Sequence, residues 1–237
     1  MISVCIATCN GEKYIKEQLD SILPQLGEND EIIISDDNSV DNTIDIIQSY
    51  NDTRIKFFFN KKENKGYTYN FENALLHVSG DYIFLSDQDD IWVENKVQVI
   101  QSCLQEMGNV LIMTDAFMTD ADGNIQKQLS EWRHYRKGFW KNLYKGVYVG
   151  CTMAFTKEML QYFLPIPSGL YGHDVWFGLL SELKYKIVYI KQPLIYYRRH
   201  DSVHSFSGKK SKNSIWFMFK YRFDFFVEVI KKRMFYQ

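Results

Sequence analysis

The feature that most constrains the fold is a regular alternation of short apolar runs with longer segments of helical spacing, which continues as far as Met107. The apolar runs are Ile2–Ala7, Glu31–Ser35, Ile55–Phe59 and Asp81–Ser86, and the helical segments are Glu12–Leu23, Asp41–Tyr50, Tyr67–Val78 and Val93–Met107. Strands joined by helices of this length form parallel sheets that helices cover on both faces. The sequence therefore predicts an α/β fold with a Rossmann-like, mixed but mostly parallel sheet.

Beyond about Val110 the pattern becomes mixed. It predicts strands at Leu111–Met118, Ile125–Leu129, Ile187–Ile190 and Leu194–Tyr197, and helices at Gly138–Lys145, Lys157–Phe163 and Asp174–Leu183. A chain of 237 residues is too short for two ordinary domains. We therefore expect one domain over residues 1–205, made of halves 1–110 and 111–205 that share a sheet, followed by a helical segment over 206–237.

The charge balance and the cysteines limit the class of protein. The 28 basic and 29 acidic residues give a net charge of −1, which excludes the global positive field of a nucleic-acid-binding protein. The four cysteines form no C-x-x-C pair, so we expect reduced thiols in a cytoplasmic protein. The first residues predict a strand rather than a secretion signal, and no apolar run reaches the roughly 18 residues of a membrane span.

The turn after the fourth expected strand carries the most informative chemistry. Asp87, Asp89 and Asp90 place three carboxylates within four residues, where they repel one another. A divalent cation bound to a diphosphate would offset this repulsion, and hard oxygen ligands suit Mg²⁺ or Mn²⁺. The alternative is a solvated acidic loop in which Asp90 caps the helix that begins near Val93.

Polar residues also follow the first two strands and precede the third helix. Thr8 follows the first strand, and Asp36 and Asp37 follow the second, at the carboxyl edge where such sheets bind ligands. A carboxylate there can accept the imide N–H of a pyrimidine, although Asp36 can equally form an Asx turn. Lys65 can meet a phosphate, and Gly66 beside it allows close approach.

Two further clusters occur in the second half. In Gly172-His173-Asp174 the acid opens a helical segment, so Asp174 is either an N-cap or a general base that accepts a hydroxyl proton. Arg198-Arg199-His200 follows the last expected strand. Its cations can stabilise a leaving diphosphate and His200 can add a metal ligand, whereas the alternative is a charged surface.

Six segments, in this order, resemble the signatures of the family 2 glycosyltransferases, which are inverting enzymes of the GT-A fold. They are Ser3–Asn10, Ile34–Ser39 with Asp41 and Thr43, Asn64–Gly66 with Asn70, Gly80–Ile83 leading into Asp87–Asp90, Gly150–Met153, and His173–Asp174. The resemblance covers roughly residues 1–205. The run SDQDDIW is particularly similar to bacterial members that build surface polysaccharides, including rhamnosyltransferases.

The resemblance implies a role for each matching position. Thr8 and Asp37 would contact the nucleoside, Asp87 the ribose or the metal shell, Asp89 the metal itself, and Asp174 would be the catalytic base, with His200 as a further metal or diphosphate ligand. Lys65 and Arg198 complete the expected nucleotide-sugar site. The family often has Glu-Asp where this chain has His173-Asp174, so acceptor positioning differs. No Q-x-x-R-W element follows the base, which favours transfer of one sugar over polymerisation.

These expectations describe a metal-dependent enzyme that transfers a sugar from a UDP-hexose or dTDP-rhamnose to a hydroxyl of a glycan or lipid-linked acceptor. A sugar nucleotidyltransferase would share the fold, but its phosphate loop needs an arginine that the turn Thr8–Glu12 lacks. A receiver-type signalling domain is much shorter than this chain. An inactive binding module would not need Asp37, Asp89 and Asp174 together.

The segment after residue 208 is both basic and aromatic. Lys209, Lys210, Lys212, Lys220, Arg222, Lys231, Lys232 and Arg233 outnumber Asp224 and Glu228, and Trp216, Phe219, Phe223, Phe226 and Ile230 recur at helical spacing. Such a helix can lie in an anionic membrane interface, which would hold the protein peripherally at the inner face of the cell membrane. The alternative is a terminal helix that packs on the domain or on a partner subunit of a homo-oligomer.

Overall fold

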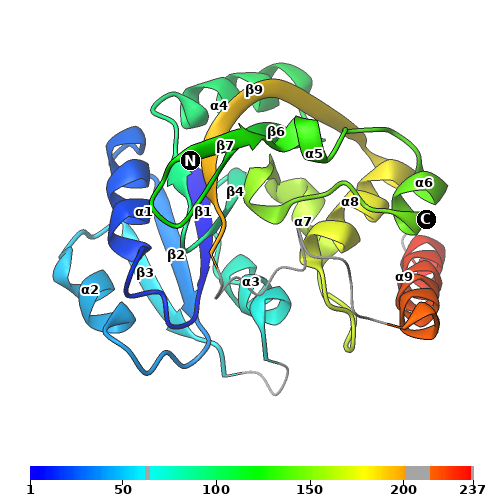
Figure 1. Cartoon of the computed structure of the whole chain (residues 1–237), viewed down its shortest axis with the longest axis horizontal. Helices are drawn as coiled ribbons and strands as arrows, with labels where there is room; N and C mark the ends of the chain where they lie inside the picture. The colour runs from blue at the N-terminus through cyan, green and yellow to red at the C-terminus, as the bar shows by residue number, and fades with distance from the viewer. Residues whose placement is uncertain (62–64, 201–213, 236–237) are drawn as a thin grey trace.

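A single curled sheet runs through both halves of the molecule (Figure 1), and the computed structural model describes residues 1–61, 65–200 and 214–235. The strand order is β3-β2-β1-β4-β8-β6-β9-β5, with β7 paired to β6. The strands are β1 (Ile2–Thr8), β2 (Glu31–Asp36), β3 (Ile55–Phe59), β4 (Tyr82–Asp87), β5 (Ile91–Trp92), β6 (Val110–Thr119), β7 (Ile125–Gln128), β8 (Met153–Thr156) and β9 (Lys186–Arg198). Pairing is parallel from β3 to β4 and between β6 and β9, and antiparallel elsewhere, which confirms the predicted mixed sheet.

Helices cover both faces of this sheet. They are α1 (Ile15–Ile22), α2 (Thr43–Ser49), α3 (Tyr67–Leu75), α4 (Lys96–Met107), α5 (Leu129–Trp132), α6 (Phe139–Tyr144), α7 (Lys157–Phe163), α8 (His173–Lys184) and α9 (Ile215–Phe235). Because side chains alternate along a strand, Val4 and Ile6 of β1 join the core that contains α1, α2 and α4, while Cys5 joins the core that contains α3, α7 and α8. None of the helices in the described ranges has the length and apolar character needed to cross a bilayer.

Several elements differ from the sequence-based expectations. The two strands expected on either side of Pro193 are one strand, β9, whose pairing with β6 shifts register beside that proline. Proline has no backbone N–H for the ladder, which explains why the sequence suggested a break there. Neither β5 nor β8 was expected. The helix expected from Val93 begins at Lys96, because β5 pairs with β9 and Val93 N donates to Leu194 O at 3.0 Å.

The register of the sheet brings several strand ends to one level. Thr8 pairs with Asp36, and its neighbour Ala7 pairs with Asp87, so β1, β2 and β4 end side by side. From the other half, β9 crosses beside β6, pairs with β5 and ends at Arg198 next to the turn that follows β4. The loops at this edge therefore come from both halves of the chain.

The C-terminal helix α9 lies at the periphery beside α6 and α8, at the end of the molecule away from α1 and α2 (Figure 1). Its inner face packs on the domain through Phe225 and Val229, which are fully buried. The expected helix is present, and one of its faces packs on the domain. The basic residues Lys209, Lys210 and Lys212 lie outside the described residues.

Candidate active site

The turn after β2 is ordered by buried hydrogen bonds. Thr8 is fully buried, and its Oγ1 donates to Asp36 Oδ2 at 2.8 Å. Asp36 also accepts from the backbone N and the Oγ of Ser39, three residues on, at 2.7 and 2.6 Å, so its carboxylate is used within its own loop, although not in the Asx turn that the sequence allowed. Both side chains thereby position the neighbouring residue, Asp37.

Asp37 lies where the loops after β2 and β3 meet. Its carboxylate accepts from Gly66 N at 2.7 Å and from Asn60 Nδ2 at 3.2 Å, and Lys65 Nζ lies 3.4 Å away. Gly66 has a φ of 93°, which glycine adopts without the strain that a side chain would cause. The structure thus brings together Asp37 and Lys65, which belong to separate sequence motifs. Asn64, the first residue of the second motif, lies outside the described residues.

The turn after β4 is tied to the end of β9. Asp90 is buried, and its Oδ1 accepts from Arg198 N at 3.1 Å. It therefore does not cap α4, whose first helical residue follows Asn95. Asp89 is partly exposed, and its Oδ2 lies 2.9 Å from His200 Nε2. Asp89 and His200, predicted separately as metal ligands, are therefore neighbours in space.

Gln88, within the same turn, is a residue that the sequence analysis did not identify. Its side chain accepts from Cys9 N at 2.8 Å and donates to Cys9 O at 3.1 Å. A Cβ on Gly11 would lie 2.4 Å from Gln88 Oε1, so the absence of a side chain at Gly11 makes room for this pair of hydrogen bonds. They fix the loop after β1 against the acidic turn. A glutamine between aspartates gives no separate sequence signal for such a role.

The acidic turn packs against two buried residues, Cys151 and Lys96. Asp87, Asp90 and Cys151 each offer a ligand atom, and these atoms lie within 4.8 Å of one another. Burial, and then the charge of Asp89, raise the pKa of Asp87 to about 7, and burial also raises the pKa of Asp90. Lys96 is buried as well, and its Nζ donates to Cys151 O at 3.0 Å. Burial lowers the pKa of Lys96 to about 8, although the nearby acids favour its charged form.

Arg198 supports the acidic turn from the other half of the chain. It is 5% exposed, and its guanidinium donates to Asp89 O and Ala121 O, each at 3.0 Å, and to the Glu17 carboxylate. The same group lies 4.4 Å from the centroid of the Tyr14 ring. Its predicted contact with a diphosphate would have to compete with these protein acceptors.

Asp174 faces the acidic turn from the start of α8. The N-cap of this helix is Gly172, and Asp174 lies in the first turn, where its Oδ1 accepts from Val175 N at 2.9 Å. The residue before it, His173, packs against Gly150, and the next residue, Cys151, offers a ligand atom within 4.8 Å of those of Asp87 and Asp90. These contacts bring the start of α8 to the acidic turn.

His173 fills the interior beside Asp174. It is 3% exposed, its ring centroid lies 4.2 Å from that of Phe71, and neither ring nitrogen has a hydrogen-bond partner among the described residues. Burial lowers the pKa of His173 to about 4, so the imidazole is neutral near pH 7. A Cβ on Gly150 would lie 2.4 Å from His173 Nε2, so the glycine makes room for the ring. This contact joins two of the six sequence signatures.

The polar atoms of the acidic turn suit a hard divalent cation. Adjacent ligands of an octahedral ion with bonds of about 2.1 Å lie about 3 Å apart. The Asp89 Oδ2 to His200 Nε2 distance of 2.9 Å matches this spacing, and Asp87 supplies another carboxylate from the same turn. Asp87, Asp89 and His200 could hold Mn²⁺ or Mg²⁺, and so could Asp87, Asp90 and Cys151, whose ligand atoms lie within 4.8 Å of one another.

Sequence comparison gives both a family and individual relatives. The family model described as "Glycosyl transferase family 2" matches residues 3–163. The Campylobacter jejuni GalNAc(5)-diNAcBac-PP-undecaprenol beta-1,3-glucosyltransferase is 28% identical over 219 residues, which are 85% of this chain and 66% of that protein. The Escherichia coli UDP-Glc:alpha-D-GlcNAc-diphosphoundecaprenol beta-1,3-glucosyltransferase WfgD is 28% identical over 183 residues, which are 77% of this chain and 70% of that protein. The chain thus spans about two thirds of the length of these relatives.

Solved structures agree on the fold. S. aureus TarS 1-349 in complex with UDP-GlcNAc has a TM-score of 0.71 at 18% identity, over 100% of this chain and 73% of that one. Mycobacterium tuberculosis glucosyl-3-phosphoglycerate synthase, in complex with Mn²⁺, UDP and glucosyl-3-phosphoglycerate, has a TM-score of 0.62 at 21% identity, over 84% and 72%. These likenesses confirm the predicted GT-A fold. Since the family model spans the loops that carry Asp37 and the acidic turn, the chain belongs to glycosyl transferase family 2.

Proposed function

We propose that this chain transfers one sugar from a nucleoside-diphosphate donor to an acceptor hydroxyl, with inversion at the anomeric carbon and with a divalent metal ion. The observation that carries the proposal is the meeting of two acidic elements from distant parts of the chain. Asp87, at the end of β4, lies beside Cys151, and the adjacent Gly150 contacts His173, the neighbour of Asp174 at the start of α8. A direct displacement needs one acidic group for a metal-bound diphosphate and another for the acceptor proton.

The loops after β1, β2 and β3 would hold the nucleoside. Asp37 would accept the imide N–H of a uracil or thymine ring, in the loop that Thr8 and Asp36 order. Lys65, whose Nζ is 3.4 Å from Asp37, would approach the donor phosphates. The donor would be a UDP-hexose or dTDP-rhamnose, in line with the names of relatives such as WfgD and the Shigella flexneri dTDP-rhamnosyl transferase RfbG.

The metal would be held by Asp89 and His200, with Asp87 in its surroundings. When bound, Mn²⁺ or Mg²⁺ would supply positive charge that stabilises the departing diphosphate. Arg198 would act on this step through its hydrogen bond to Asp89 O, because that bond fixes the backbone from which the Asp89 carboxylate projects. Gln88 would hold the loop after β1, on the nucleoside side, at a fixed distance from the metal-binding turn after β4 through its two hydrogen bonds to Cys9.

Asp174 would act as the general base. It would accept the proton of the acceptor hydroxyl while the acceptor oxygen forms a bond to the anomeric carbon and the bond from that carbon to the diphosphate oxygen breaks. Its place in the first turn of α8 puts it beside the partial positive charge of the helix N-terminus. A single displacement of this kind inverts the configuration and needs no covalent intermediate on the protein.

The acceptor would be a glycan or a lipid-linked saccharide in the synthesis of a bacterial surface polysaccharide. The names of the Campylobacter jejuni and Escherichia coli relatives both contain an undecaprenol-linked diphosphate. Such an acceptor would place the reaction at the inner face of the cell membrane. The lack of a Q-x-x-R-W element after Asp174 supports transfer of a single sugar.

Two variants with opposite signatures test the proposal. In calorimetry with UDP or dTDP, Asp89→Ala should lose Mn²⁺-dependent binding, because it removes a carboxylate ligand. Asp174→Asn should bind the nucleotide with nearly unchanged affinity, but should turn over about 10²–10⁴-fold more slowly, because only the proton acceptor of the transition state is lost. Turnover is measured as nucleotide release from UDP-glucose or dTDP-rhamnose with GlcNAc-diphosphoundecaprenol as acceptor.

The matched control is Asp45→Ala, which removes an exposed carboxylate on α2 and should leave both quantities unchanged. Wild-type nucleotide–Mn²⁺ affinity in Asp89→Ala would contradict the assignment of the metal site. Wild-type turnover in Asp174→Asn would show that the base is another residue.

A further inference from the structure

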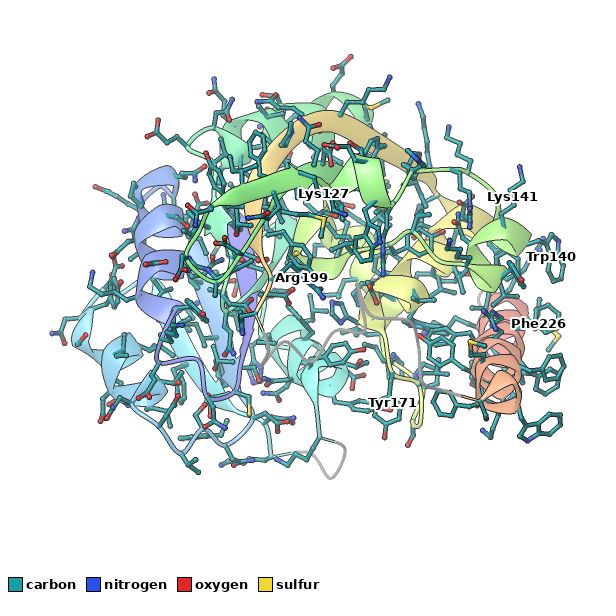
Figure 2. The ribbon with its side chains drawn as sticks, in the orientation of Figure 1. Lys127, Trp140, Lys141, Tyr171, Arg199 and Phe226 are labelled. Atoms are coloured by element: carbon teal, nitrogen blue, oxygen red, sulfur yellow. The ribbon has the colours of Figure 1, made fainter. Side chains whose placement is uncertain are left out.

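One surface of the molecule lies outside the proposed transfer chemistry. We define the aromatic face as the exposed rings of α6 and α9, which are Trp140, Tyr144, Trp216, Phe219 and Phe223, each between 54% and 74% exposed. The three α9 rings form a row, with centroid separations of 6.0 and 6.4 Å. Phe226 follows Phe223 by three residues on α9, and its ring centroid lies 5.5 Å from that of Trp140 on α6 (Figure 2). Trp140 thereby extends the row onto α6. Two helices that are distant in the sequence therefore build one surface.

The two helices that carry the aromatic face are also basic. Lys141 lies on α6, Lys145 directly follows it, and Lys220, Arg222, Lys231 and Arg233 lie on α9, whereas Lys232 of α9 donates to Leu164 O on the domain. The acids of α9, Asp224 and Glu228, are each paired at 2.6 Å with a lysine of the same helix. Because the whole chain carries a net charge of −1, this end of the molecule is more basic than the remainder.

We propose that the aromatic face is a docking surface for an anionic lipid bilayer, which α6 and α9 contact together at the level of the headgroups. Tryptophan and tyrosine rings are amphipathic and favour this interface, while basic flanks are attracted to anionic lipids. The charge distinguishes this occupant from a second copy of the chain. Two copies joined through the aromatic face would bring like-charged flanks together, which repel each other.

The opposite side of α9 touches the turn that precedes the proposed base. Tyr221 Oη donates to Tyr171 O at 2.8 Å, and a Cβ on Gly172 would lie 2.9 Å from that hydroxyl. Tyr171, labelled in Figure 2, precedes Asp174 by three residues. One helix thus separates the aromatic face from the acceptor side of the site. Resting on the proposed function, this arrangement would bring the headgroup of a lipid-linked acceptor to Asp174.

Co-sedimentation of the full chain with vesicles tests the proposal. The protein should bind vesicles of phosphatidylglycerol and phosphatidylcholine, bind pure phosphatidylcholine more weakly, and lose binding as salt screens the charges. Trp140→Ser and the double variant Trp216→Ser/Phe219→Ser should each weaken binding. Lys141→Ala should weaken it about fivefold, the effect of one basic residue near an anionic surface.

The matched controls are Leu76→Ser and Ile125→Ser, which remove exposed apolar side chains at the end of α3 and on β7 and should bind as the wild type does. Equal partitioning of all variants would overturn the proposal. So would a dimer in sedimentation velocity that Trp140→Ser dissociates, because it would assign the surface to a second copy. Nucleotide–Mn²⁺ affinity is measured on the same samples. Its absence in the wild type would contradict the proposed function alone, whereas vesicle binding would still support the docking surface.

Discussion

His173 and Asp174 are adjacent residues in different environments. Asp174 lies in the first turn of α8, where its Oδ1 accepts from Val175 N at 2.9 Å. His173 is enclosed by aromatic rings and has no hydrogen-bond partner among the described residues, so its charged form is disfavoured. One helix start thus holds a hydrogen-bonded carboxyl group beside an enclosed, neutral imidazole, and the sequence alone, which allowed a plain cap at Asp174, did not reveal this contrast.

The environment of His173 predicts a pH dependence of stability. Its pKa falls from the ordinary 6.5 to about 4 in the folded protein, so the unfolded chain binds a proton between these values that the folded chain does not. His173 should therefore contribute a loss of about 2 to 3 kcal/mol of stability between pH 7.5 and 4.5. Asp87, whose raised pKa acts in the opposite direction over this range, titrates in both the wild type and His173→Gln, so urea denaturation should show the loss as the difference between the two proteins. Equal losses in both proteins would show that His173 is not the titrating group.

At the scale of elements, the site is held together by contacts between segments that local sequence patterns do not predict. The first half was readable because β1, β2 and β4 are unbroken apolar runs that end in polar turns. The strands β5 and β8 have two and four residues, too few to show a strand period. The contacts of Arg198 are equally hidden, because its partners Glu17, Asp89 and Ala121 come from three separate segments. Sequence patterns predicted which residues would lie at the site but not the hydrogen bonds that hold them there.

The contact of Gly150 with α8 gives a prediction at this scale. Gly150→Ala would place a Cβ 2.4 Å from His173 Nε2, so the packed ring or the backbone must shift. Overpacking of this kind costs about 1–3 kcal/mol. In Gly150→Ala/His173→Ala the ring is gone, so the added methyl should cost much less than it does in the presence of His173. Additive free energies of unfolding across the four proteins would contradict the contact.

For the whole molecule, the loops from both halves should become more stable when the donor site is filled. A ligand at 100 times its dissociation constant adds about 2.7 kcal/mol, and for a chain of this size each kcal/mol raises Tm by about 2–4 °C. UDP or dTDP with Mn²⁺ should therefore raise Tm by about 5–10 °C. Thermal denaturation with UMP is the matched control, since UMP lacks the second phosphate. An equal shift with UMP would show that the diphosphate does not bind through the metal.

The path of β9 has a consequence for how the protein is made. Asp89 and His200 are 111 positions apart, and His200 follows the last strand of the sheet. Translation therefore produces the acidic turn long before its histidine, and through that interval Asp87, Asp89 and Asp90 have neither Arg198 nor His200 beside them. A nascent chain on the ribosome can form the parallel strands β1 to β4, because domains fold from the N-terminus as they emerge. It cannot yet bring Asp89 and His200 together, so on the proposed metal assignment this pair of ligands would form only after His200 has emerged from the ribosome.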